Sequence, residues 1–120
     1  MQNKKILVCE DDKDIVFFLK IFFKKKDFDF IILEEGKEVI PAVRNNDIGV
    51  ILLDLGLPDI DGEIIAEELR KNEKTKHIPI ILFSAGSRVK EVAEKVKADG
   101  YIKKPFNLKE LESVIKEKLA

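Results

Sequence analysis

Five short apolar runs, separated by stretches with helical periodicity, constrain the fold of this chain more than any other feature. The runs occupy residues 6–9, 28–33 (interrupted by Asp29), 50–53, 80–83 and 101–102. They are rich in Ile, Val, Leu and Phe, and they are too short for ordinary helices. They therefore predict strands that are buried on both faces, as in a parallel sheet.

The segments between the runs predict helices. Asp12 and Asp14 can cap the first helix, and Asn107 the last, where Glu110 follows as in a capping box. A weaker helix is expected near residues 37–44, where Pro41 must lie in the first turn or kink the helix. The apolar stripes that we expect to face the core are Ile15, Phe18, Leu19, Phe22 and Phe23; Ile64, Ile65 and Leu69; Val89, Val92, Ala93 and Val96; and Leu108, Leu111, Ile115 and Leu119.

Strand and helix thus alternate five times along the chain. Right-handed crossovers convert this order into an α/β fold with a doubly wound, five-stranded parallel sheet, a (βα)5 flavodoxin-like arrangement. The chain has 120 residues and no linker rich in Ser, Gly or Pro. We therefore expect a single domain over residues 1–120.

Composition argues against several classes of function. Lys and Arg number 22 against 23 Asp and Glu, so the formal charge is −1. This balance gives no electrostatic reason to expect direct DNA binding or an anionic membrane partner. Cys9 is the only cysteine, and neither a signal peptide nor a membrane span is recognisable. We expect a cytoplasmic protein.

Polar side chains stand at the carboxyl ends of four of the runs, the edge where doubly wound sheets bind ligands. Glu10 and Asp11 follow the first run, Asp54 the third, Ser84 the fourth and Lys104 the fifth. Clustered carboxylates repel one another unless a cation such as Mg²⁺ is bound, and lysine and serine can contact a phosphoryl group. The set predicts a magnesium site around a carboxylate nucleophile.

Each member of this set also has an ordinary structural explanation. Acidic runs such as residues 10–12 often cap helices, and a single Asp after a strand is often a turn residue. Lys-Pro pairs are common in loops. Only the coincidence of all four features at one edge favours a functional site.

Four motifs make the chain resemble the receiver (phosphoacceptor) domain of two-component response regulators, in particular the single-domain type of the chemotaxis response regulator. The motifs are KKILVCEDD, ILLDLGLPDIDG, ILFSAG and GYIKKPF, in family order and spacing. The resemblance implies phosphorelay signalling rather than enzymatic turnover. A histidine kinase, a histidine phosphotransfer protein or a small phosphodonor would supply the phosphoryl group, and a downstream protein partner would read the resulting conformational change.

The resemblance implies a role for each matching residue around the metal. Asp54 is the expected phosphoacceptor. Asp11 is expected to bind Mg²⁺ directly and Glu10 largely through water. Asp54 and the backbone carbonyl of Gly56 complete the expected ligand set.

The same resemblance assigns the switch. Ser84 is the expected switch hydroxyl and Tyr101 the expected aromatic switch residue. Lys104, rather than Lys103, is expected to contact the phosphoryl group. Its bond to Pro105 is typically cis in the family, although most X-Pro bonds are trans.

Three positions depart from the family pattern. Gly56 and Gly86 offer no side chains beside the expected path of attacking water, which implies an open phosphoryl group that is either short-lived or accessible to a phosphatase. Lys97 stands where relatives often end a helix with Gly. The exact end of the fourth helix is therefore open.

Three other classes of function compete with this interpretation. An aspartyl-phosphate hydrolase usually needs an acid two residues after its nucleophile, where this chain has Gly56. A flavodoxin-like cofactor binder needs a first loop rich in Ser, Thr and Gly, whereas this loop is acidic. A scaffold that has lost phosphorylation would not need Asp54 and Lys104.

Phe17 and Ile21 point away from the expected core stripe of the first helix. They are four residues apart, so they are neighbours on one helix face. Two adjacent exposed apolar side chains begin a patch, which favours a partner-binding or self-association face that could form a homodimer. The alternative is that they lie under the stems of Lys20, Lys24 and Lys25.

Overall fold

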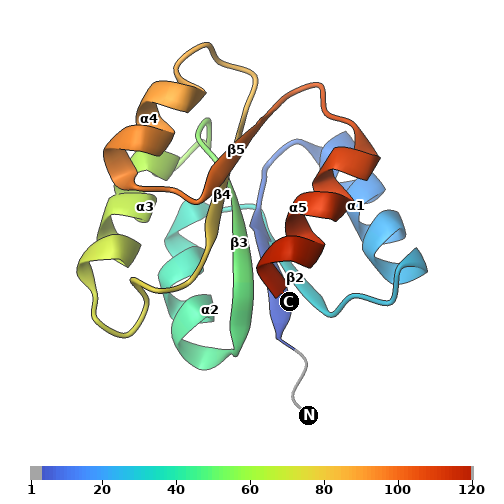
Figure 1. Cartoon of the computed structure of the whole chain (residues 1–120), viewed down its shortest axis with the longest axis horizontal. Coiled ribbons are helices and arrows are strands. Elements are labelled where there is room, and N and C mark those ends of the chain that lie inside the picture. Colours follow the sequence, from blue (N-terminus) through green and yellow to red (C-terminus); the bar gives the residue numbers. More distant parts are fainter. Residues whose placement is uncertain (1–3, 120) are drawn as a thin grey trace.

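Five parallel strands pair in the order β2-β1-β3-β4-β5 in the computed structural model, which describes residues 4–119 (Figure 1). The strands are β1 (Lys5–Cys9), β2 (Phe30–Leu33), β3 (Ile48–Asp54), β4 (Ile80–Ser84) and β5 (Gly100–Lys103). Each of the five apolar runs contributes one strand. The expected doubly wound α/β fold is confirmed.

Helices cover both faces of the sheet. α1 (Lys13–Lys25) and α5 (Leu108–Leu119) lie on one face (Figure 1). The short 3-10 helix η1 (Gly36–Glu38), α2 (Val39–Asn45), α3 (Gly62–Lys71) and α4 (Val89–Val96) belong to the other side. Among the helices of residues 4–119, none combines the length and apolar character needed to cross a membrane.

Alternate residues of each central strand feed two separate cores. In β1, Ile6 and Val8 pack with α1 and α5, whereas Leu7 and Cys9 pack with the helices of the other face. All four side chains are fully buried. Burial on both faces explains why the apolar runs are continuous instead of alternating with polar residues.

Three predicted core positions are wrong. Phe18 of α1, Ile64 of α3 and Leu108 of α5 expose 61%, 58% and 41% of their surface. Val16 is buried on the inner side of α1 instead. Successive helical residues are rotated by about 100°, so each apolar stripe spreads over a wide arc of its helix. The arc is wider than the surface that the sheet covers, and the residues at its margin stay exposed. Phe18 therefore points beside the sheet, toward the start of α5.

The helix ends follow the expected chemistry in most places. Asp12 caps α1, because its side chain accepts hydrogen bonds from the backbone N–H groups of Asp14 and Ile15. Pro41 lies in the first turn of α2. Asn107 accepts from the N–H of Lys109 at the start of α5.

Lys97 resolves the open end of the fourth helix. It follows α4 in a left-handed conformation with φ of 59°. This conformation usually favours glycine and is sterically costly for a lysine. The backbone therefore ends α4 in the conformation that a helix-ending glycine commonly adopts, with Lys97 in its place.

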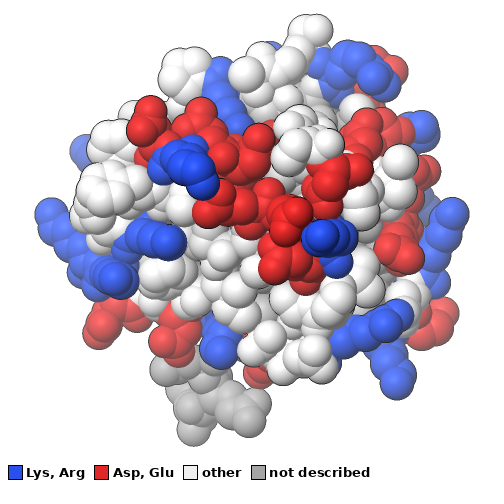
Figure 2. All heavy atoms as spheres, turned by 180° about the vertical axis from the view of Figure 1, so that it is seen from behind, with Lys and Arg blue, Asp and Glu red and all other residues white. Residues whose placement is uncertain are grey.

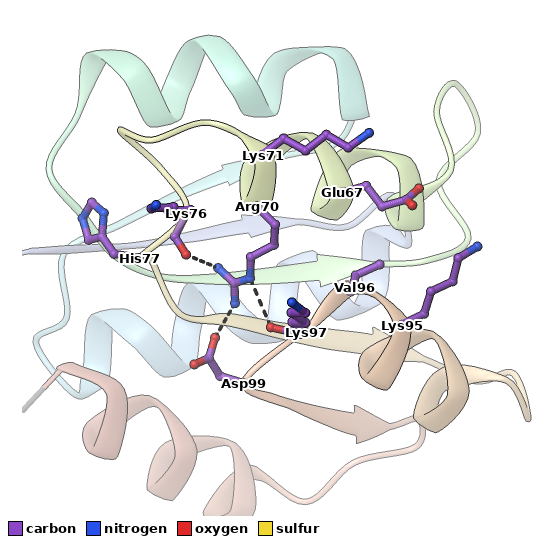
Figure 3. A pocket seen from close by; sticks show the side chains of 9 residues that line it. All are labelled: Glu67, Arg70, Lys71, Lys76, His77, Lys95, Val96, Lys97 and Asp99. Carbon is purple, nitrogen blue, oxygen red and sulfur yellow. Dashed lines mark hydrogen bonds and ion pairs between the residues drawn. The ribbon is translucent and has the colours of Figure 1, made fainter.

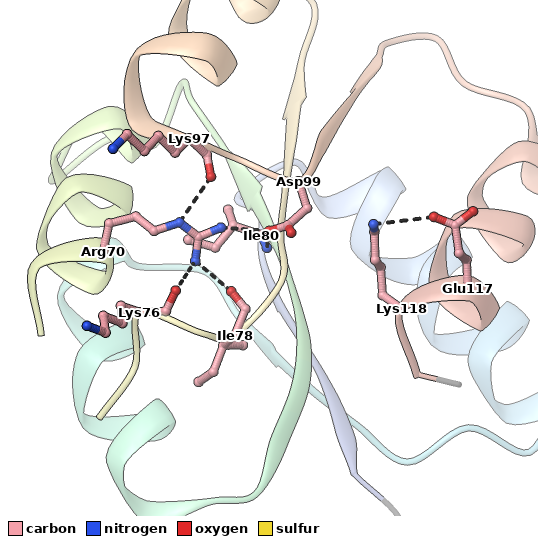
Figure 4. Close-up of polar contacts among 8 residues, drawn as sticks. All are labelled: Arg70, Lys76, Ile78, Ile80, Lys97, Asp99, Glu117 and Lys118. Atoms are coloured by element: carbon pink, nitrogen blue, oxygen red, sulfur yellow. Dashed lines mark hydrogen bonds and ion pairs between the residues drawn. The ribbon is translucent and has the colours of Figure 1, made fainter. Parts of the chain in front are cut away.

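Arg70 joins three segments near the amino-terminal ends of the strands, at the end of the sheet opposite the acidic cluster (Figure 4). Its guanidinium donates to the carbonyl oxygens of Ile78 (2.7 Å), Lys76 (3.0 Å) and Lys97 (3.1 Å). It also forms an ion pair with Asp99 at 2.6 Å. One side chain from α3 thus fixes the entry to β4 and the turn between α4 and β5.

Arg70→Ala should lower the free energy of unfolding by about 2–3 kcal/mol, because several acceptors lose their donor at once. Urea unfolding measures the change. Lys71→Ala is the matched control, because Lys71 follows Arg70 and its side chain is exposed. This substitution should change the free energy of unfolding by less than about 0.5 kcal/mol. Equal effects of the two substitutions would contradict the role of Arg70.

Candidate functional site

The carboxyl ends of the strands bring four of the candidate side chains to one edge of the sheet. Glu10 follows β1, Asp54 ends β3, Ser84 ends β4 and Lys104 follows β5. β1 and β3 are the neighbouring strands from which the chain proceeds to opposite sides of the sheet. This is the topological switch point, where the fold leaves a crevice for ligands.

Three carboxylates form a tight cluster in this crevice. Glu10, Asp11 and Asp54 each place one oxygen within 4.8 Å of the others. Glu10 and Asp54 are buried. Carboxylate oxygens at this spacing are the ligands that a hard divalent cation prefers, so the cluster fits Mg²⁺.

Lys104 supplies positive charge to the two buried acids. Its Nζ lies 2.5 Å from Glu10 Oε1 and 3.4 Å from Asp54 Oδ2. The same ammonium lies 5.3 Å from the centroid of the Phe83 ring, where a cation is favoured. Lys103 is exposed and forms no ion pair within residues 4–119. The geometry thus brings the second lysine, and not the first, to the acids.

Burial perturbs the Glu10 carboxyl strongly. Its side chain is fully buried, and burial raises the pKa of Glu10 to about 7. The ammonium of Lys104 and the backbone N–H of Asp12, which donates to Glu10 Oε2 at 3.1 Å, oppose this shift of the pKa. A bound cation would favour the ionised form further.

The loops after β3 and β4 orient Asp54 and Ser84 in the same way. Asp54 Oδ1 accepts from the N–H of Gly56 at 3.0 Å, and Ser84 Oγ accepts from the N–H of Gly86 at 2.9 Å. A methyl group added at Gly56 would lie 3.9 Å from Asp54 Oδ1, in otherwise open space. One added at Gly86 would lie 3.4 Å from Ser84 Oγ. Both glycines therefore leave space beside the Asp54 carboxylate and the Ser84 hydroxyl.

Two residues that support the site were not identified from the sequence. Asp59 accepts from the N–H groups of Gly36 (2.8 Å) and Lys37 (3.0 Å), and these bonds hold the pKa of Asp59 below its usual value. They join the loop after β3 to η1. Gly62 begins α3 so close to the Asp54 carbonyl oxygen that a side chain would collide with it. The PDIDG sequence suggests only a turn and a helix start.

The remaining candidates lie at different depths. Tyr101 in β5 is 38% exposed, and its proposed switch role stays a prediction. Cys9 lies beneath the acids, and burial raises the pKa of its thiol to about 12, so the thiol stays protonated and unreactive.

An apolar groove borders the site next to Lys104. It has a volume of about 590 Å³ and lies between the start of α1 and the loop from β5 to α5. The Lys104–Pro105 peptide bond in this loop is cis. The apolar residues that line the groove are Ile15, Phe18, Ala85, Pro105, Phe106 and Leu108.

Acidic side chains gather on one face of the molecule (Figure 2), although the net charge is close to zero. Figure 2 shows the face opposite to that of Figure 1, and acidic side chains gather there in a band across the upper half. A field of this sign attracts a divalent cation or a basic partner.

A larger pocket of about 690 Å³ lies near the ends of α3 and α4 (Figure 3). Basic side chains dominate its lining, among them Arg70, Lys71, Lys76 and Lys97. Arg70 and Asp99 are already engaged with each other, as Figure 3 shows. Basic residues at helix ends also complement the helix dipoles, so this pocket needs no ligand to explain it.

Comparison with known proteins identifies relatives over almost the whole chain. Residues 6–116 match the family model described as response regulator receiver domain. A probable transcriptional regulator, ycf27 of Porphyridium aerugineum, is 35% identical over 99% of this chain. The chain spans only 49% of that relative, so it corresponds to about half the length of the whole regulator.

Solved structures show the same fold. The receiver domain of Saccharomyces cerevisiae Ssk1, solved in complex with the histidine phosphotransfer protein Ypd1, has a TM-score of 0.88 and 23% identity, with 98% of this chain and 89% of that one covered. The receiver domain of a Pseudomonas aeruginosa sensor histidine kinase, solved with a magnesium ion in its active-site cleft, has a TM-score of 0.88 and 22% identity, with 98% of each chain covered.

The raised pKa of Glu10 predicts a pH-dependent stability. Because the folded state holds a proton that the unfolded chain loses near pH 4.5, stability falls as the pH rises from about 4.5 through about 7. Glu10→Gln should remove this contribution. Urea unfolding in EDTA at pH 5 to 8 should show wild type losing stability relative to the variant as pH rises. A difference that stays constant over this window would contradict the shift.

Proposed function

This chain belongs to the response regulator receiver domain family of two-component signalling, and from that premise we propose that Asp54 is its phosphoacceptor. The observation that carries the proposal is the position of Asp54, buried within 4.8 Å of two other acids and 3.4 Å from Lys104 Nζ. Among the described acids, Glu10 shares this burial, cluster and lysine, but it is fully buried, whereas the Asp54 carboxylate has open space beside it at Gly56.

The acidic cluster would hold Mg²⁺. Asp11 and Asp54 would bind the ion directly together with the backbone carbonyl of Gly56, and Glu10 would act largely through water. The magnesium ion in the Pseudomonas aeruginosa receiver supports this proposal. When bound, the ion neutralises charge on the phosphoryl oxygens and on the attacking carboxylate.

Three residues of this chain would then act on the phosphoryl group. A carboxylate oxygen of Asp54 forms a bond to phosphorus, and the bond from phosphorus to the donor's histidine nitrogen breaks. The imidazole leaves with the electron pair of that bond and takes a proton from solvent. Lys104, already 3.4 Å from Asp54, pairs with the new phosphoryl oxygens, and the Ser84 hydroxyl donates to one of them.

Pairing of Lys104 with the new phosphoryl group would also signal that the reaction has occurred. Lys104 contacts both Glu10 and Asp54, so a phosphoryl group competes with Glu10 for its ammonium. Ser84 ends β4, Lys104 follows the neighbouring strand β5, and Tyr101 lies on β5 opposite Leu82 of β4. A shift of these groups would present a changed surface to a downstream protein partner.

Receiver domains interact with histidine kinases or histidine phosphotransfer proteins, and we propose that such a donor docks on the apolar groove beside Lys104. The groove is open, largely apolar and adjacent to the acids. Phe18 and Leu108 line it while remaining exposed. An apolar side chain of the donor could fill it and bring the phosphohistidine to Asp54.

The open space beside Gly56 and Gly86 favours a short-lived phosphoryl state, because no side chain blocks water from the phosphorus. The same space argues against a hydrolase of free substrates. Such an enzyme would need a second acid where Gly56 stands.

Incubation with Mg²⁺ and a small phosphodonor such as phosphoramidate should add one phosphoryl group, stable in acid and labile in base, measured by intact mass. Asp54→Asn should abolish the adduct. Asp11→Ala should weaken Mg²⁺ binding more than about tenfold, and more than Glu10→Ala, because a direct ligand is lost.

Asp12→Ser is the matched control for these substitutions. It removes a neighbouring negative charge but keeps a side chain that caps α1. It should leave the adduct in place. Labelling of Asp54→Asn at the wild-type level would contradict the assignment of the phosphoacceptor.

Phe18→Ala should slow phosphoryl transfer from a histidine-phosphorylated protein donor by about tenfold and leave transfer from phosphoramidate unchanged, because only the protein donor needs the groove. Transfer reactions that are quenched at successive times measure the rate with each of the two donors. Ile64→Ala is the control, since Ile64 is equally exposed but lies on α3. Equal slowing by both variants, or slowing with both donors, would argue against docking at the groove.

A further inference from the structure

The outer face of α1 carries an apolar pair between two opposite charges. Phe17 and Ile21 expose 63% and 51% of their surface, so the stems of neighbouring lysines do not cover them. Asp14 stands before this pair and Lys24 after it, and both are exposed. Neither charge takes part in an ion pair among residues 4–119.

These four residues form one narrow seam. At 100° per residue, Asp14, Phe17, Ile21 and Lys24 fall within an arc of about 80°. Their spacing of three, four and three residues is that of a coiled-coil contact line. The opposite side of the helix, with Val16, Leu19 and Phe23, is buried against the sheet. The α1 seam is thus a complete helix-contact face with nothing packed on it in the described chain.

We infer that the α1 seam pairs with the α1 seam of a second copy of this chain in antiparallel orientation. A two-fold axis at the level of Leu19 sets Phe17 against Ile21 of the other copy, and Ile21 against its Phe17. The same axis sets Asp14 against Lys24 at both ends. The seam is self-complementary in shape, hydrophobicity and charge, as a two-fold symmetric interface requires.

Charge also selects the orientation. In a parallel pair, Asp14 would face Asp14 and Lys24 would face Lys24, and both contacts repel. The antiparallel pair converts both into attraction. Flanking charges do not reverse this choice, because Lys13 is paired with Glu34 at 2.9 Å, and Lys20 and Lys25 project from the two sides of the seam.

The size of the seam sets the strength of the association. A helix of 13 residues is about 20 Å long, so one helix pair buries less than the roughly 1,200 Å² of a stable complex. The lysines on either side add mutual repulsion. The expected dimer is weak and depends on concentration. It does not rest on the phosphoacceptor role of Asp54, which a small phosphodonor tests separately.

Charge exchange provides the test. Sedimentation equilibrium of the full chain should show weak dimerisation. Asp14→Lys alone and Lys24→Asp alone should each weaken it by about tenfold, because both end contacts become repulsive. The double variant Asp14→Lys with Lys24→Asp should restore wild-type association. Circular dichroism and urea unfolding of each variant verify that α1 remains folded.

Cross-linking checks the register. Asp14→Cys mixed with Lys24→Cys should form an intermolecular disulfide, whereas Asp14→Cys alone should not, because its two copies lie about 15 Å apart along the pair. Cys9 is buried and does not compete. Efficient cross-linking of Asp14→Cys to itself would overturn the antiparallel arrangement.

Phe17→Glu with Ile21→Glu tests the apolar pair itself, because it sets like charges against each other across the two-fold axis. Loss of dimerisation in this variant supports the inference. A wild-type chain that remains monomeric at millimolar concentration overturns it. The inference is also overturned if the variant changed at Phe17 and Ile21 keeps its oligomeric state but loses phosphoryl transfer from a histidine donor. The face would then belong to that donor.

Discussion

Two buried carboxylates that share one lysine are the interaction on which the rest of the site depends. Glu10 and Asp54 are held at adjacent strand ends, where both side chains are buried and their charges repel. Lys104 contacts both and relieves the repulsion. Such an arrangement is poised to change, because a cation or a phosphoryl group alters which acid the lysine prefers.

The two ends of the sheet have different mechanical roles. At one edge, Arg70 and Asp99 fix the entry to β4 and the turn before β5 with several hydrogen bonds. At the other edge, Ser84 and Lys104 end the same two strands beside open space. Under the proposed mechanism, a movement of Ser84 and Lys104 would act on strands that are anchored at their far ends, which would direct the change to the surface near β5 and α4.

The sequence predicted the strands and the edge that carries the acids because both depend on local pattern. Apolar runs reveal strands buried on both faces, and parallel pairing alone brings their carboxyl ends together. The errors at Phe18, Ile64 and Leu108 have one cause: periodicity gives the direction of a side chain but not the width of the surface beneath it. Contacts made by Arg70 and Asp59 join segments distant in sequence, and the close approach of Gly62 to the Asp54 carbonyl depends on the folded loop, so no local pattern could reveal them. The pairing of Lys104 with Glu10 likewise required the folded geometry.

A crystal structure of the chain with Mg²⁺ and beryllofluoride tests the central claim most directly. The account predicts beryllium on a carboxylate oxygen of Asp54, with Mg²⁺ beside Asp11. It also predicts that Lys104 Nζ moves from Glu10 to a fluorine atom. A beryllofluoride group on any other residue, or a Lys104 that stays on Glu10 while Asp54 carries the group, would contradict it.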